Sequence, residues 1–131
     1  MSYDIRLAVA VAGAPVNEDG EPLYAVIGTP EYDSPTYNLG DMFRACTGWD
    51  FEQGKFYRVS EVLPLIEKGI HELRFNGKAY KKYEPDNGWG SIGGALEALE
   101  SMLECIERNG PFEQWFSGWN EIPLECLYIA W

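Results

Sequence analysis

Two segments in the second half of the chain repeat apolar residues at helical spacing, and this pattern constrains the fold most. In residues 60–76, Val62, Ile66 and Leu73 fall on one helical face, with Asn and Gly closing the segment. A second segment runs from residue 91 or shortly after to about residue 108. Each helix must bury its apolar stripe, so the remaining chain has to supply a surface that covers it.

The two ends of the chain supply strands for this purpose. Apolar and polar residues alternate over residues 3–12, and residues 23–27 return after a turn rich in Gly and Pro, which predicts a hairpin. Residues 54–59 form a short extended piece, and residues 124–131 a last strand. A third, short helix is expected between Asn38, as its N-terminal cap, and Gly48.

This order of elements predicts the α+β class. We expect a single domain over residues 1–131, with a small antiparallel sheet, made of the N-terminal hairpin and the C-terminal strand, covered by about three helices. Residues 78–90, rich in aromatic and basic side chains, are expected to form a loop.

Length and composition narrow the class of protein further. With 131 residues, the chain suits one core rather than two. It lacks an apolar run of about 18 residues, so no transmembrane helix is expected, and the first residues do not resemble a signal peptide. Three cysteines, an odd number at irregular spacing, favour buried, reduced thiols in a cytoplasmic protein.

Charge is high and unevenly distributed. The net charge is −11, but residues 54–83 hold seven bases against three acids, while residues 91–131 hold seven acids against Arg108 alone. Nucleic acid and anionic membranes would be repelled by most of this surface, so neither is an expected partner. A basic protein is a better match, although acidity can also serve solubility alone.

Candidates for catalysis and metal binding are few. His71 is the single histidine, and no Cys-x-x-Cys pair, Gly-x-Ser-x-Gly elbow or phosphate-binding loop occurs. Each of the three cysteines has an apolar residue directly beside it, which favours packing over nucleophilic chemistry. We therefore predict no enzyme activity, no metal and no cofactor.

Aromatic residues give the sequence its most informative cluster. Gly-Trp occurs three times, and such pairs commonly cover a core, since glycine lets the backbone approach the indole closely. The alternative is a ligand pocket for a nucleotide or another phosphorylated small molecule, with stacking rings and ammonium groups. Its predicted lining is Tyr37, Asn38, Trp49, Lys78, Tyr80, Lys81, Lys82, Tyr83, Asn87 and Trp89. The glycine-rich opening of the last helix, near Gly93, either allows a tight turn or holds an anion.

The last helix also carries an acidic outer edge, which we expect to contact a partner together with two tryptophans from the following connection. Exposed aromatic residues beside an acidic rim have the composition of a protein-binding hot spot. The predicted partner-binding residues are Glu97, Glu100, Glu104, Glu107, Trp115 and Trp119.

Three segments carry a resemblance to a family of small phage- and prophage-encoded proteins of unassigned biochemical role. They are Thr36-Tyr37-Asn38-Leu39-Gly40 with Phe43, then Leu63-Pro64-Leu65-Ile66-Glu67-Lys68-Gly69-Ile70 with Leu73, and Tyr83-Glu84-Pro85-Asp86-Asn87-Gly88-Trp89-Gly90, leading into the last helix and a Trp-containing C-terminal strand. The resemblance implies a small accessory protein of the host bacterial cytosol and transfers no catalytic residue.

Four hypotheses follow. The first is an acidic binding protein that inhibits a bacterial defence nuclease, such as a CRISPR effector, by occupying its basic nucleic-acid surface. The second is a protein that sequesters a small molecule or nucleotide in the aromatic pocket. An enzyme and a minor virion component are the third and fourth. The sequence is also compatible with a homodimer that pairs through the last strand, if this strand lies at a sheet edge.

Overall fold

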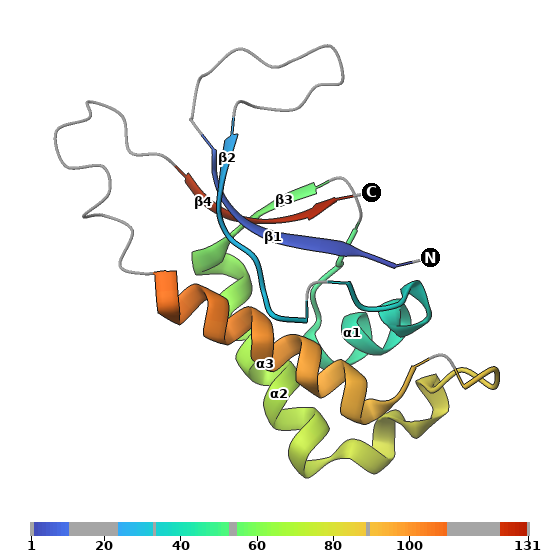
Figure 1. Cartoon of the computed structure of the whole chain (residues 1–131). Helices are drawn as coiled ribbons and strands as arrows, with labels where there is room; N and C mark the ends of the chain where they lie inside the picture. The colour runs from blue at the N-terminus through green and yellow to red at the C-terminus, as the bar shows by residue number, and fades with distance from the viewer. Residues whose placement is uncertain are drawn as a thin grey trace, which may run out of the picture.

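Over the residues that the structure describes, the fold consists of a four-stranded sheet and three α-helices (Figure 1). The computed structural model describes residues 2–10, 24–32, 34–52, 55–88, 90–109 and 124–130. The strands are β1 (Asp4–Ala10), β2 (Tyr24–Gly28), β3 (Lys55–Arg58) and β4 (Leu124–Ala130). The helices are α1 (Gly40–Thr47), α2 (Val59–Phe75) and α3 (Ile92–Asn109), with 3₁₀ turns η1 (Tyr37–Leu39) and η2 (Gly77–Tyr83). The predicted α+β class is confirmed.

The sheet is antiparallel, with strand order β2-β1-β4-β3. The expected hairpin of β1 and β2 forms, and the C-terminal strand pairs with β1, placing Leu7 opposite Leu127. The extended piece after residue 54 joins as a fourth strand. Because β4 lies between β1 and β3, it is not an edge strand, and the condition for self-association through this strand is not met.

The helices lie together on one side of the sheet (Figure 1), and the core fills the space between these layers. Ile5 and Leu7 of β1 are fully buried, as are Phe43 of α1, Ile66 of α2 and Leu99 of α3. The period of two in the strand and the longer period in the helices both bring apolar faces to this one core. The core therefore uses the apolar stripes that the sequence displays.

Two local predictions need correction. Asn38 does not cap the first helix: the Thr36 side chain accepts a hydrogen bond from the Asn38 amide at 3.4 Å, and η1 leads into α1. A hydroxyl two residues earlier takes the role because the chain enters α1 through a 3₁₀ turn. The segment after Gly77 is not a loop in its first half, since η2 continues the chain from α2, with the Ala79 amide bonded to the Asn76 carbonyl.

Candidate functional site

The acidic stripe, which we define as Glu97, Glu100, Glu104 and Glu107, follows a single ridge of α3. Its spacings of three and four residues keep the side chains on one helical face. The opposite face carries the buried residues Ala95, Ala98, Leu99, Met102, Cys105 and Ile106. The packing of α3 against the core therefore directs all four glutamates outward.

Two arginines offset part of this charge. Arg74 of α2 approaches Glu100 at 2.7 Å between Nη2 and Oε1, and Arg108 approaches Glu104 at 3.7 Å. Both pairs are well exposed to solvent, where an ion pair contributes between 0 and about 1 kcal/mol. Within the part of the chain that the structure describes, Glu97 and Glu107 have no ion pair. Trp115 and Trp119, predicted to complete this surface, lie outside the described residues.

Part of the predicted aromatic pocket does assemble. A cavity of about 440 Å³ lies where η1 and the start of α1 face the end of η2, and it brings Tyr37, Asn38 and Lys82 together. We call it the polar cavity. Tyr83, also predicted, lines it as well, whereas Lys81 does not. Sequence reasoning missed the rest of the lining, which comes from three separate segments: Tyr3, then Asp41 and Arg44 of α1, and Glu84, Pro85 and Asp86 after η2. The Asp41–Arg44 spacing was a usable signal, since residues three apart on a helix can pair.

The cations of the polar cavity are held by the protein itself. Arg44 Nη1 lies 3.1 Å from Asp41 Oδ1, and Arg44 Nε donates to the Asp50 carbonyl at 3.1 Å. The Lys82 ammonium lies over the Tyr83 ring, 5.3 Å from its centroid. Burial raises the pKa of Tyr3, whose hydroxyl also contacts the Arg44 guanidinium.

Carboxylates outnumber cations in this lining, with Asp41, Glu84 and Asp86 against Arg44 and Lys82. A phosphate group would meet this excess of negative charge, which weakens the nucleotide hypothesis.

Other residues predicted for the pocket lie elsewhere. Trp49 is 2% exposed and packs edge-on against Phe51 and Tyr57, with ring centroids 4.9 and 5.1 Å away. Its placement in a pocket is therefore wrong, and the alternative of a ring covering the core holds for this Gly-Trp pair. The indole Nε1 has no hydrogen-bond partner among the described residues.

Lys78, Tyr80 and Asn87 do not line the polar cavity. The Tyr80 hydroxyl instead donates to Glu72 Oε2 at 3.0 Å, and burial, followed by this carboxylate, raises the pKa of Tyr80. Trp89 lies outside the described residues.

Two backbone amides at the glycine-rich opening of α3 already have acceptors within the protein. The Ile92 amide donates to Glu84 Oε2 at 3.1 Å, and the Gly94 amide donates to Ser91 Oγ at 3.0 Å. Gly90 has φ of 137°, and a Cβ there would lie 2.8 Å from Leu39 Cδ2. The tight-turn interpretation is confirmed, and the Glu84 carboxylate takes the position that a bound anion would need.

The thiols are placed for packing. Cys46 and Cys105 are buried, as predicted, and burial raises the pKa of Cys46 to about 11 and also raises that of Cys105. A thiol with such a pKa holds its proton near neutral pH and is a poor nucleophile. The Cys126 side chain lies outside what the structure describes. His71 is exposed on α2, with its ring 4.8 Å from the Phe75 ring.

Among the described residues, no group of three His, Cys, Asp or Glu side chains is arranged to hold a metal ion. No described helix combines the length and the apolar character needed to cross a bilayer. No protein-family model, curated protein or solved structure matches this chain. The resemblance to phage-encoded proteins therefore stays a prediction.

Proposed function

We propose that this protein is a non-enzymatic binding protein, and that the acidic stripe of α3 covers a basic surface of another protein. The observation that carries the proposal is the arrangement of four glutamates on one ridge, directly opposite the buried face of a well-packed helix. A rigid helix holds the carboxylates in a fixed row, so a complementary partner need not order them on binding.

The stripe has dimensions that suit a nucleic-acid-binding groove. Glu97 and Glu107 are separated by about 15 Å along the helix axis, since each residue rises about 1.5 Å. One strand of duplex DNA carries a phosphate about every 3.4 Å. Four carboxylates over this length give roughly two-thirds of that strand's charge density, before the offset by Arg74 and Arg108 is counted. The partner we propose is therefore a protein whose basic groove normally holds nucleic acid.

The resemblance described above narrows the proposed partner to a nuclease of bacterial defence, encountered in the host cytosol. The protein would act stoichiometrically, by excluding nucleic acid from the groove. Net charge supports this mode, because a chain of charge −11 is steered toward basic surfaces and away from nucleic acid.

The test begins with a pull-down. The tagged protein is incubated with nuclease-treated lysate from a bacterium that carries a defence locus, and the retained proteins are identified. A retained nuclease is purified, and its DNA cleavage is measured against increasing amounts of the protein. We expect inhibition at a one-to-one ratio, competition by excess DNA, and affinity that falls steeply with salt. Binding that is insensitive to salt would contradict the proposal.

A matched pair of variants tests the assignment to α3. The double reversal Glu97→Lys and Glu107→Lys changes the two stripe residues that lack a described ion pair, and we expect it to abolish inhibition. The control, Glu61→Lys with Glu67→Lys, makes the same change of charge at exposed positions of α2. Equal loss in both variants would show a general effect of net charge and would overturn the role of the stripe.

A further inference from the structure

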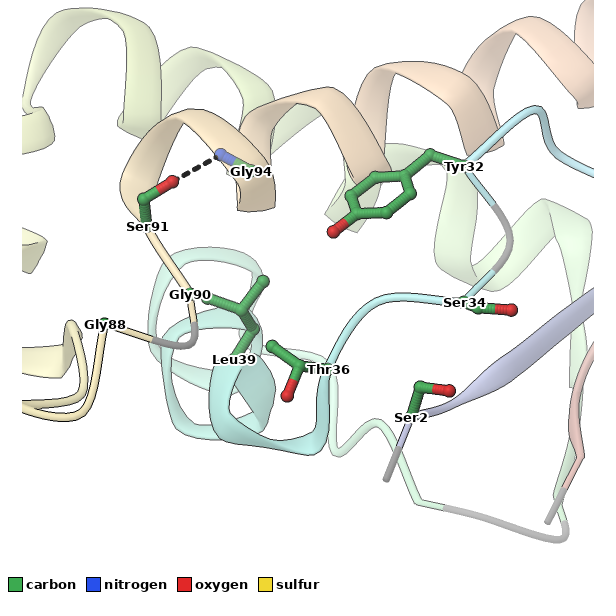
Figure 2. A pocket seen from close by; sticks show the side chains of 9 residues that line it. All are labelled: Ser2, Tyr32, Ser34, Thr36, Leu39, Gly88, Gly90, Ser91 and Gly94. Carbon is green, nitrogen blue, oxygen red and sulfur yellow. Dashed lines mark hydrogen bonds between the residues drawn. The ribbon is translucent and has the colours of Figure 1, made fainter.

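A second cavity, of about 540 Å³, is lined by hydroxyl groups (Figure 2). It lies between the segment that joins β2 to η1 and the segment that leads into α3, and its volume is in the range of small-molecule sites. We call it the hydroxyl cavity. The lining residues with hydroxyls are Ser2, Tyr32, Ser34, Thr36 and Ser91. Three of these hydroxyls also have partners in the protein: Ser34 Oγ donates to Asp4 Oδ1 at 3.4 Å, Thr36 Oγ1 accepts from the Asn38 amide at 3.4 Å, and Ser91 Oγ accepts from the Gly94 amide at 3.0 Å.

None of the described residues that line the hydroxyl cavity carries a charge. The nearby start of α3 offers little to an anion, because Glu84 and Ser91 already accept from its Ile92 and Gly94 amides. A charged ligand would therefore find no counter-charge among the described lining residues to replace the hydration it loses on binding. The lining therefore favours an uncharged ligand over a phosphate, a carboxylate or an amine.

The walls of the hydroxyl cavity are held in place by tertiary contacts. The Tyr32 amide donates to Ser101 Oγ at 3.2 Å, and Ser101 Oγ lies 3.3 Å from the Tyr32 carbonyl, which fixes this residue against α3. Leu39, only 1% exposed, packs behind the cavity. Gly90 approaches Leu39 so closely that no side chain would fit between them. The cavity is thus formed before any ligand arrives.

The walls of the hydroxyl cavity combine polar hydroxyl groups with an apolar ring. Figure 2 shows the Tyr32 hydroxyl directed into the space that Thr36 and Ser91 also border. No described residue forms a hydrogen bond with this hydroxyl. Hydroxyl groups both donate and accept hydrogen bonds, so they match a ligand that carries hydroxyls of its own. The Tyr32 ring adds apolar surface for the carbon skeleton of such a ligand.

We propose that the hydroxyl cavity binds an uncharged sugar, either a free saccharide or the ribose of a nucleoside. This site is separate from the acidic stripe and does not depend on the proposed function. No covalent step is involved: the protein would hold the sugar by hydrogen bonds from the hydroxyl groups and by contact with the Tyr32 ring.

Ligand-observed NMR, combined with two-dimensional amide spectra of the isotope-labelled full chain, tests the proposal. The probes are glucose, galactose, mannose and ribose, with adenosine and uridine to distinguish a nucleoside from a free sugar. Glucose 6-phosphate and glucuronic acid are the charged counterparts. We expect saturable binding of at least one neutral probe, with shifts in the amide signals of Tyr32, Gly88 and Gly94. Binding of charged probes alone, or of no probe, would overturn the proposal.

Two pairs of variants locate the site. Gly94→Leu places a side chain in the cavity and should abolish binding, whereas Gly93→Leu adds the same side chain one residue earlier, outside the lining, and should not. Tyr32→Phe removes one hydroxyl and should weaken binding about threefold to tenfold. Tyr83→Phe, in the polar cavity, is its control. If Gly94→Leu bound the sugar as well as the unmodified protein, the site would lie elsewhere.

Discussion

At the scale of single residues, one glycine sets how closely the three helices meet. A Cβ on Gly69 of α2 would lie 2.5 Å from Thr47 Cγ2 and 2.9 Å from Leu99 Cδ1. Thr47 belongs to α1 and Leu99 to α3, so both neighbours approach α2 at this point. The Thr47 hydroxyl is itself bonded to the Phe43 carbonyl and to the Trp49 amide, which limits how far it can shift.

We expect Gly69→Ala to destabilise the protein. Alanine favours a helix over glycine by about 1 kcal/mol, but overpacking a core costs about 1–3 kcal/mol, so the net change should be unfavourable. Gly93→Ala is the control, because its nearest atom would be Ser91 Oγ at 3.8 Å and only the helix preference remains. Urea unfolding of both variants measures the difference. A Gly69→Ala protein as stable as Gly93→Ala would show that the helices can separate at little cost.

At the scale of elements, the last strand along the chain is a central strand of the sheet. β4 pairs with β1 over seven residues and with β3 over four. Without β4, the two-stranded ribbon of β1 and β2 has no neighbour, and β3 has no partner. A two-stranded ribbon has little stability of its own.

Deletion of residues 124–131 should therefore abolish cooperative unfolding. We expect the truncated chain to lose its sharp thermal transition in near- and far-ultraviolet circular dichroism, while some helical signal remains. Addition of a synthetic peptide of residues 124–131 should restore part of the transition. A truncated protein that melts within a few degrees of the intact chain would contradict the central position of β4.

At the scale of the whole molecule, the charges are separated as well as unbalanced. The acidic stripe lies along α3, while exposed cations follow the end of α2 and η2, namely Arg74, Lys78, Lys81 and Lys82. The net charge of −11 still dominates. Self-repulsion of this size opposes the compact state, because folding brings like charges closer together.

Salt should accordingly stabilise the free protein. Between about 0.01 M and about 1 M NaCl the Debye length falls from about 30 Å to about 3 Å, which screens the long-range repulsion more than the contact pairs. We expect Tm to rise by a few degrees over this range. The rise should be smaller in the variant that carries Glu97→Lys and Glu107→Lys, since its net charge is lower. A fall in Tm would show that ion pairs such as Arg74–Glu100 matter more to stability than repulsion does.

The sequence by itself determined the class of fold, the helices and the outward direction of the acidic stripe. These properties depend on local periodicity: Ile66 and Leu73 repeat at helical spacing, and Glu97 and Glu107 fall on the opposite side of a helix from its apolar residues. Gly48, which has a positive φ, ended α1 where the sequence predicted a helix end.

Only the tertiary structure decided which residues share a cavity and where β4 lies. Tyr3 and Lys82 are far apart in sequence, and no local pattern predicts that they line one cavity. The aromatic ring of Trp49 suits a ligand pocket, yet packing against Phe51 and Tyr57 buries it. Strand order and side-chain burial depend on contacts between distant segments, and such contacts leave no periodic signal in the sequence.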